Sequence, residues 1–255
     1  MASHNDQVQG QFGAVADEYL KSPVHAQGVD LDWLVGKLRG QTSAAVLDLG
    51  CGAGHLSFAI APHVGPVTAY DLSSEMLEVV AREARMRRLD NIAMRRGVAE
   101  ELPFSDARFD YVCTRYSGHH WADVAAALLE MRRVLKATGH LIIIDVLAPA
   151  SPLLDTHLQT LELLRDPSHV RNYSLQEWSA QLSTAGFSSV TSRTWKLRLG
   201  FDAWVARMRT PATRVAVLRS LLAGAPEEVR DYLGVESDGS FQIDAGLIEA
   251  TTQAP

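Results

Sequence analysis

The sequence predicts an α/β fold, a doubly wound and mostly parallel sheet of the Rossmann-like type with helices on both faces. From Val46 onward, short apolar segments alternate with segments of helical periodicity, which is the pattern of strands joined by crossover helices. The first apolar segment runs through three glycines at alternate positions, 50 to 54, directly into a helical segment. The run 141–147 is apolar apart from one acid, as expected of a central strand covered on both faces.

The core of this fold is expected at residues 46–147, preceded by an N-terminal helical lid at 1–45. Apolar runs predict strands at 46–50, 66–71, 92–97, 109–114 and 140–147, and the segments between them predict helices at 54–63, 74–88 and 122–136. Ser73 followed by Glu75 is a typical helix start. In the lid, residues 11–20 carry apolar side chains at near-helical spacing, which predicts that this segment is partly helical.

The alternation breaks after Pro149, and we expect a cap over the site together with the C-terminal part of the sheet at 148–210. Helices are predicted at 152–166 and 174–185 and a strand at 187–199. Residues 211–255 are expected to form C-terminal helices, a final strand near 240–243 and a disordered tail at 250–255. We expect the whole chain, 1–255, to be a single domain.

Composition excludes several classes of protein. The net charge of −6 over 255 residues disfavours a partner such as nucleic acid, which selects a basic face. No apolar run reaches the roughly 18 residues that cross a membrane, and the N-terminal residues lack a secretory pattern, so a cytoplasmic protein is expected. The two cysteines, Cys51 and Cys113, form no CxxC pair, which favours reduced thiols and predicts no metal site.

The glycine segment and an acid beyond it describe one side of a nucleoside-binding crevice. Strand one is expected to end at Gly50, and Asp71 ends strand two, where a carboxylate can accept both hydroxyls of a ribose. A dinucleotide fingerprint is G-x-G-x-x-G, but the sixth position here is His55. The spacing G-x-G-x-G fits a cofactor without phosphates, and Asp48 is a candidate acceptor for the ammonium of its amino-acid tail.

Five stretches together carry a family resemblance: VLDLGCGAGHL, AYDLSSEML, GVAEELPF, FDYVCTRYSGHH and RRVLKATGHLIIIDV. They resemble the class I S-adenosylmethionine-dependent methyltransferases, most closely the type 11 group related to ubiquinone and menaquinone biosynthesis. The resemblance implies a seven-stranded sheet with a small helical cap. It also implies S-adenosylmethionine as the cofactor, with S-adenosylhomocysteine as its product.

The same resemblance assigns cofactor contacts. It implies that Asp71 binds the ribose hydroxyls and that Tyr19 closes over the cofactor. Arg115 is implied at the cofactor edge, where it also faces the acceptor. The other implied contacts border the methionine part and the adenine: Asp48, Gly50, Cys51, Gly52, Leu72, Met76, Val98, Ala99 and Glu100. Many relatives have an aspartate where this chain has Val98, so here backbone groups would have to bind the adenine amino group.

Candidate catalytic residues follow the fourth predicted strand and occur within the fifth. His119 and His120 could act as a general base or orient the acceptor, since histidine titrates near neutral pH; His120 is slightly favoured, and the alternative is a pair of structural loop histidines. Arg115 supplies a cation at the same crevice. Asp145 either faces the site, which we favour, or is a buried acid that needs a partner.

Acceptor binding is predicted from the loop after strand four and from the cap. Tyr116, Arg171 and Tyr173 are candidates to hold an anionic or aromatic acceptor, although residues 169–173 could instead be a solvated loop. Arg207 and Arg209 are interpreted as a solvated helix face, with a role in a lid as the second possibility.

The leading hypothesis is methyl transfer from S-adenosylmethionine to a small-molecule acceptor, at carbon, nitrogen or oxygen, by in-line displacement. The alternatives are a nicotinamide-dependent oxidoreductase, which the spacing at His55 disfavours, and a non-catalytic protein that binds S-adenosylmethionine. Either a monomer or a homodimer is compatible with the sequence.

Overall fold

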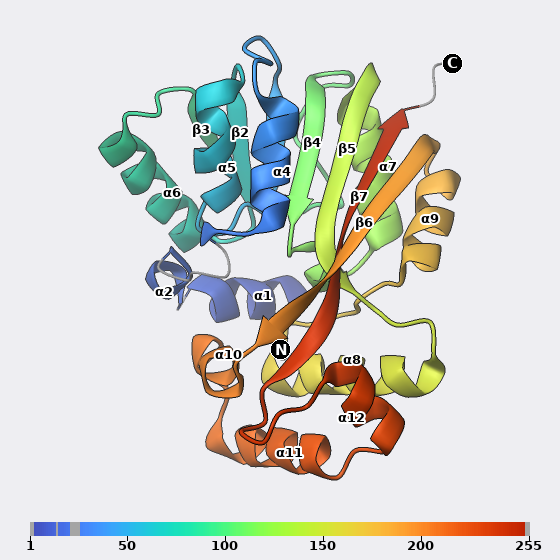
Figure 1. Ribbon diagram of the computed structural model, residues 1–255. Coiled ribbons are helices and arrows are strands. Elements are labelled where there is room, and N and C mark those ends of the chain that lie inside the picture. The colour runs from blue at the N-terminus through green and yellow to red at the C-terminus, as the bar shows by residue number, and fades with distance from the viewer. Residues whose placement is uncertain (1–2, 14, 21–25, 253–255) are drawn as a thin grey trace.

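A seven-stranded sheet organises the computed structural model, which describes residues 3–13, 15–20 and 26–252 (Figure 1). The strand order is β3-β2-β1-β4-β5-β7-β6. In the chain, the strands span β1 (Val46–Leu49), β2 (Val67–Asp71), β3 (Ile92–Arg96), β4 (Phe109–Arg115), β5 (Leu135–Leu147), β6 (Phe187–Leu199) and β7 (Phe241–Thr252).

Strand direction confirms the predicted mostly parallel sheet. The five strands β1 to β5 pair in parallel, whereas β7 runs antiparallel to both of its neighbours, β5 and β6. The chain order reverses at β1, which lies between β2 and β4. In open α/β sheets a ligand binds beyond the carboxyl ends of the strands at such a reversal, so the topology places a crevice after Leu49 and Arg115.

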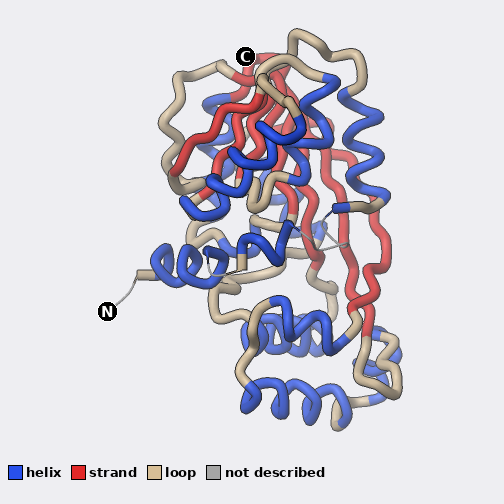
Figure 2. Tube along the Cα trace, turned by 90° about the vertical axis from the view of Figure 1, so that its left-hand side faces the viewer, coloured by secondary structure: helices blue, strands red, loops and turns tan. Residues whose placement is uncertain are grey.

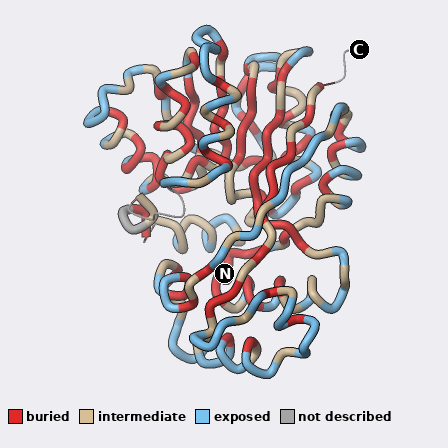
Figure 3. Tube along the Cα trace, viewed as in Figure 1, coloured by how far each residue is buried: buried red, intermediate tan, exposed pale blue. Residues whose placement is uncertain are grey.

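Helices cover both faces of the sheet, because successive strand side chains point to opposite sides (Figure 2). Val46 packs with α4 (Val29–Leu38), α5 (His55–Ile60) and α6 (Ser74–Arg87). Its neighbour Leu47 packs on the other face with α7 (Val124–Val134) and α9 (Leu175–Thr184). The 3-10 turns η1 (Ala61–His63) and η2 (Gly118–His120) follow α5 and β4. The central strands β1, β2, β4 and β5 are largely buried between these two layers, whereas the edge strands β3 and β6 are mostly half-buried or exposed (Figure 3).

A separate group of helices forms a cap beyond the carboxyl ends of the parallel strands (Figure 1). It consists of α8 (Pro152–Arg165), α10 (Phe201–Arg207), α11 (Ala212–Ala223) and α12 (Glu227–Leu233). These helices share a core with the ends of β6 and β7, in which Trp204 and Phe241 pack edge to face at 5.0 Å. The long strands β6 and β7 therefore join the sheet to the cap.

The N-terminal segment crosses between the sheet and the cap as two helices, α1 (His4–Gly13) and α2 (Ala16–Leu20). The helical spacing over 11–20 is confirmed at residues 11–13, which end α1, and at residues 16–20, which form α2. Gln11 donates to the Met208 carbonyl at 2.9 Å, and a ring nitrogen of His4 lies 2.8 Å from the His120 carbonyl. The segment thus contacts both halves of the molecule.

Two further boundaries differ from the prediction. Strand β5 begins at Leu135 rather than at residue 140, and α7 accordingly ends at Val134. The predicted disordered tail was wrong for residues 250–252, which belong to β7: Thr252 pairs with Phe187 and donates to the Ala137 carbonyl at 2.6 Å. Residues 253–255 lie outside the described part of the chain. Among the described residues, none of the helices has the length and apolar character needed to cross a membrane.

Candidate active site

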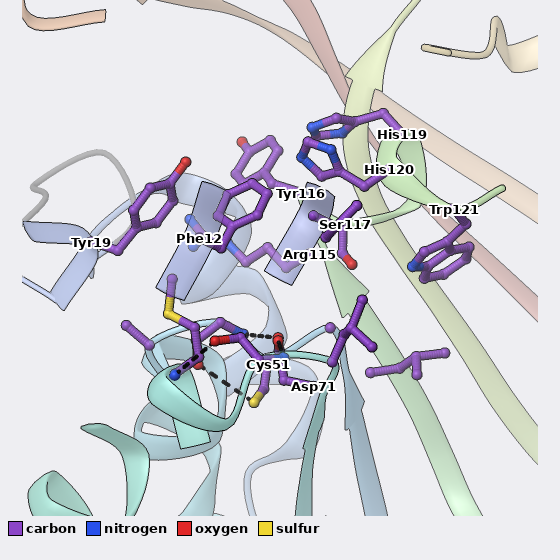
Figure 4. A pocket seen from close by; sticks show the side chains of 18 of the residues that line it. Phe12, Tyr19, Cys51, Asp71, Arg115, Tyr116, Ser117, His119, His120 and Trp121 are labelled. Carbon is purple, nitrogen blue, oxygen red and sulfur yellow. Dashed lines mark hydrogen bonds between the residues drawn. The ribbon is translucent and has the colours of Figure 1, made fainter. Parts of the chain in front are cut away.

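A cavity opens where the sheet topology places the crevice, between the carboxyl ends of the strands, the N-terminal helices and the cap (Figure 4). The residues implied as cofactor contacts all line it: Tyr19, Asp48, Gly50, Cys51, Gly52, Asp71, Leu72, Met76, Val98, Ala99, Glu100 and Arg115. His119, His120 and Tyr116 line the same cavity. The structure therefore brings the predicted donor side and the loop after β4 together.

The glycine turn after β1 makes the floor of the cavity. Gly50 has φ +69°, and a Cβ there would lie 1.9 Å from Ser117 Oγ, so only glycine fits. Gly52 has φ +50°, and a Cβ there would meet nothing within 4 Å. The amides of Gly50 and Cys51 both donate to the Tyr70 carbonyl, at 2.8 and 3.0 Å. The turn is thus tied to β2 while its backbone stays open to a ligand.

Asp71 fixes the turns after β1 and β2 relative to each other. Its Oδ2 accepts from the Gly52 amide at 2.8 Å and its Oδ1 from the Ser73 amide at 2.9 Å. Burial raises the pKa of this carboxyl, and these backbone hydrogen bonds act in the opposite direction. Each carboxylate oxygen can accept a further hydrogen bond, so the group can still receive two hydroxyls from a ligand in the cavity.

Asp48 connects β1 to the first turn of α5. Its Oδ2 accepts from the Ser57 amide at 3.0 Å and from the Ser57 hydroxyl at 2.6 Å. Burial raises the pKa of Asp48 to about 7, although these hydrogen bonds favour the ionised form. Asp48, which we expected to hold an ammonium, thus also fixes the first turn of α5. At alkaline pH its buried carboxyl group is charged.

Asp48→Asn is expected to unfold at a higher temperature than the wild type at about pH 8 without ligand, by about 2–4 °C. The folded pKa exceeds the unfolded one, so the stability contributed by Asp48 is present below about pH 4 and is lost as the pH rises through 7. The neutral amide oxygen of asparagine can still accept from Ser57. Calorimetric unfolding scans at acid and alkaline pH measure the difference, which should shrink at low pH. Asp48→Ala is the matched control that leaves Ser57 without its acceptor. If Asp48→Asn were less stable than the wild type at alkaline pH, that result would contradict the inference that the ionised carboxylate of Asp48 destabilises the folded protein.

His119 and Asp145 form a hydrogen-bonded pair at the opposite side of the cavity from the glycine turn. Nδ1 of His119 lies 2.6 Å from Asp145 Oδ1, and the His119 amide donates to Oδ2 at 3.2 Å. Burial alone lowers the pKa of His119, but the charge and hydrogen bond of Asp145 outweigh it, so the pKa is raised. Tyr116, with φ +53°, turns the chain from β4 into the η2 segment that holds His119.

Asp145, which we expected to face the site, is not among the residues that line the cavity. It is 2 % exposed within β5, where a buried carboxylate requires hydrogen-bond partners. Besides His119, the Val146 amide donates to its Oδ1 at 2.8 Å. Asp145 thus contacts a residue of the cavity lining, His119, through both its carboxylate oxygens.

His120 has a different environment from its neighbour. Its Nδ1 lies 3.0 Å from the Ser168 carbonyl, which can only accept, so Nδ1 carries the proton. Burial, reinforced by the nearby His119, lowers the pKa of His120 to about 4. Its ring packs edge-on against Phe12 at 4.9 Å (Figure 4). His120 is therefore uncharged near neutral pH and forms part of the cavity wall.

Arg115 lines the cavity as a buried ion pair. Its Nε lies 2.5 Å from Asp30 Oδ2, with the two side chains 6 % and 3 % exposed. Its guanidinium also lies 5.0 Å from the centre of the Tyr116 ring. The charge of Arg115, the cation predicted at the cofactor edge, is thus largely neutralised by Asp30 from α4.

Arg171 and Tyr173, the acceptor contacts predicted in the cap, are not among the residues that line the cavity. Arg171 pairs with Asp155 at 3.2 Å and Glu177 at 2.8 Å. The Tyr173 ring packs on Trp178 with 5.2 Å between ring centres. Both side chains stabilise the junction between α8 and α9, because local carboxylates and an aromatic neighbour satisfy them there.

Other cap residues, which the sequence did not single out as acceptor contacts, line the cavity instead. They are Leu197, Leu199 and Ile243 from β6 and β7, Glu162 and Arg165 from α8, Asp166 after it, and Trp204 and Arg207 from α10. One signal could have identified the α8 pair: Glu162 and Arg165 share the buried helix face of Leu158 and Leu161. A charged pair at that spacing on an apolar face is uncommon outside functional sites.

Comparison with known proteins identifies relatives that cover most of the chain. Residues 41–186 match the family model described as a methyltransferase domain. The uncharacterized protein YafE of Escherichia coli is 48% identical over 79% of this chain and 97% of its own. The uncharacterized methyltransferase YcgJ of Bacillus subtilis is 38% identical over 86% of this chain and 87% of its own. The crystal structure of that protein superimposes with a TM-score of 0.85 at 35% identity, covering 89% of this chain and 99% of its own.

Proposed function

The chain belongs to the S-adenosylmethionine-dependent methyltransferases, and we propose that it methylates a small molecule held between the glycine turn and the cap. The observation that carries this proposal is the composition of one cavity. Its floor is the glycine turn with Asp71, and its opposite wall is His119 backed by Asp145. A methyl donor and a base for the acceptor can therefore face each other across the same space.

The donor side has the groups that S-adenosylmethionine requires. Asp71 offers two carboxylate oxygens to the ribose, and Leu72, Met76 and Val98 offer apolar surface to the adenine. The open backbone at Gly52 lets the methionine part approach closely, with the carboxylate of Asp48 close enough to line the same space. When bound, the cofactor supplies a methyl group on a sulfonium for in-line displacement. The chain's task is to align the acceptor and exclude water.

We assign the general base to His119. With Nδ1 held by Asp145, Nε2 is the nitrogen that can take a proton from an acceptor hydroxyl or amine. The raised pKa makes His119 the more basic of the two adjacent imidazoles. His120, which we slightly favoured from the sequence, is held neutral with its Nδ1 proton directed at Ser168. Its role in the proposal is to confine the acceptor.

An acceptor of small size is supported by what surrounds the cavity. Helix α1 crosses its opening and is fastened to the cap through Gln11 and to η2 through His4. A polymer would have to displace this helix, whereas a small molecule is enclosed by it. Cys51 and Cys113 are buried free thiols, which supports action in a reducing compartment such as the cytoplasm.

The test is transfer of a labelled methyl group. The protein is incubated with methyl-labelled S-adenosylmethionine and, in separate reactions, with a library of small hydroxylated and amino compounds, total RNA, duplex DNA and unfolded protein. We expect S-adenosylhomocysteine and a labelled product only in reactions with small molecules. Labelling of a polymer would contradict the proposed acceptor class. So would the absence of any labelled product from a protein that binds the cofactor.

A further inference from the structure

Arg207 differs from the other arginines of the cavity in having no carboxylate beside it. Arg115 lies against Asp30, and Arg165 has Glu162 at 3.7 Å. For Arg207, by contrast, no side chain in the described ranges 3–13, 15–20 and 26–252 provides a carboxylate within ion-pair distance. Burial and the neighbouring Arg165 lower the pKa of Arg207. A guanidinium stays charged in proteins, so the cavity contains a cation with no carboxylate of the described residues at ion-pair distance, although the charge of Glu162 acts on it from further away.

The surroundings of Arg207 fix its position in the cap. It ends α10, one turn after Trp204, and both line the cavity. Arg165 spans the same region, with its Nε donating to the Trp204 carbonyl at 3.0 Å and its guanidinium 5.2 Å from the Trp204 ring centre. Arg165 is thus committed to Trp204 and Glu162, and Arg207 retains its donors for a ligand.

The neighbouring wall is apolar. Leu197, Leu199 and Ile243 from the ends of β6 and β7 line the cavity beside Val146 and Trp204. Such a surface binds a hydrocarbon or aromatic body, and a few fixed polar groups then orient it. Beside this wall lie Arg165, which is paired with Glu162, and Arg207, which has no carboxylate at ion-pair distance. An apolar wall with such an unpaired guanidinium at its edge is the pattern expected for an amphipathic acid.

We propose that Arg207 holds an oxyanion, a carboxylate or a phosphate, on the methyl acceptor, whose apolar body lies against β6, β7 and Trp204. The inference rests on the proposed function and specifies its substrate class. A guanidinium binds both anions through paired N–H donors. The anion would supply the counter-ion that Arg207 lacks, while the end of the acceptor that receives the methyl group points towards His119.

Arg207 belongs to the acceptor side rather than to the donor side. It is carried by the cap helix α10, whereas Asp48 and Asp71 belong to β1 and β2, and Gly52 to the turn after β1. The cap and the sheet form opposite walls of the cavity. Removal of Arg207 should therefore change acceptor affinity and leave cofactor affinity unchanged, and this separation makes the proposal testable.

The experiment uses the full chain saturated with S-adenosylhomocysteine and three fluorinated probes that share one body: 4-fluorobenzoate, 4-fluorophenyl phosphate and 4-fluorobenzamide. Fluorine NMR titrations to millimolar concentration measure their affinities. The two anions distinguish a carboxylate from a phosphate, and the neutral amide is the reference. The variants are Arg207→Gln, the charge-retaining Arg207→Lys, and Arg209→Gln as a matched control at an exposed position two residues away.

For the wild type we expect at least one anion to bind about 10- to 100-fold more tightly than the amide, as for a hydrogen bond between charged groups. Arg207→Gln should abolish this preference, Arg207→Lys should keep part of it, and Arg209→Gln should keep all of it. Equal binding of anion and amide, absence of anion binding, or a preference that survives in Arg207→Gln would overturn the proposal. A loss of S-adenosylhomocysteine affinity in Arg207→Gln would also overturn it, by placing Arg207 at the donor. Failure of the wild type to bind S-adenosylhomocysteine would instead contradict the proposed function itself.

Discussion

Replacing Asp71 with alanine is expected to weaken S-adenosylhomocysteine binding by about 100-fold or more. Two hydroxyl hydrogen bonds to a carboxylate contribute about 1.5–3 kcal/mol each, and about 1.4 kcal/mol corresponds to a tenfold change in affinity. The substitution also frees the amides of Gly52 and Ser73, which Asp71 holds at 2.8 and 2.9 Å. The glycine turn should therefore lose its alignment together with the ribose contact. Isothermal titration calorimetry on the two proteins measures the change.

A matched control separates binding from folding. Asp110 also accepts a backbone amide, that of Ala45 at 2.8 Å, and it does not line the cavity. Asp110→Ala should bind S-adenosylhomocysteine with the affinity of the wild type even where its unfolding temperature falls. Unchanged affinity in Asp71→Ala would mean that the donor binds elsewhere.

Replacing His119 with alanine is expected to lower kcat by about 100- to 10,000-fold on an acceptor whose reacting atom carries a proton, as for loss of a general base. The affinity for S-adenosylhomocysteine should stay within a small factor of the wild type, because His119 contributes no assigned donor contact. Rates of S-adenosylhomocysteine formation and a calorimetric titration provide the two readouts. His140→Ala is the matched control, since His140 also pairs with a carboxylate, Glu249 at 3.1 Å, away from the cavity.

The pH dependence of kcat tests the role of Asp145 in the same reaction. The base must be neutral to accept a proton, so kcat should rise with pH as His119 deprotonates. Asp145 holds the pKa of His119 above its ordinary value, against burial, which lowers it. Asp145→Asn removes the charge, so the rising limb of the profile should move to lower pH while the maximum falls. A limb that stays in place would show that His119 is not the titrating group.

The donor half of the site could be predicted from the sequence because its chemistry depends on local segments. The glycines at 50 to 54 and Asp71 follow directly from strands of apolar residues, and parallel strands bring their carboxyl ends to one edge. For this reason the implied contacts that follow the strands line one cavity, which is completed by Tyr19 from α2 and Met76 from α6. The sheet itself was predictable on the same basis, including the strand 187–199 with its observed bounds.

The acceptor half could not be predicted because it depends on how the cap helices pack. Arg171 and Arg207 are chemically the same, and the sequence favoured Arg171 because of its aromatic and amide neighbours. Only the packing shows that Arg171 pairs with Asp155 and Glu177, whereas Arg207 lines the cavity. Similarly, only the packing shows that Asp145 in β5 pairs with His119 in η2. Such contacts between distant segments leave no periodic pattern in the chain.

A crystal structure of the protein with S-adenosylhomocysteine bound tests the central claim most directly. We expect the ribose hydroxyls to hydrogen-bond to Asp71, the adenine to lie among Leu72, Met76 and Val98, and the sulfur to face the side of the cavity that contains His119. A ribose bound away from Asp71, or a sulfur directed away from His119, would contradict the proposed arrangement of donor and base.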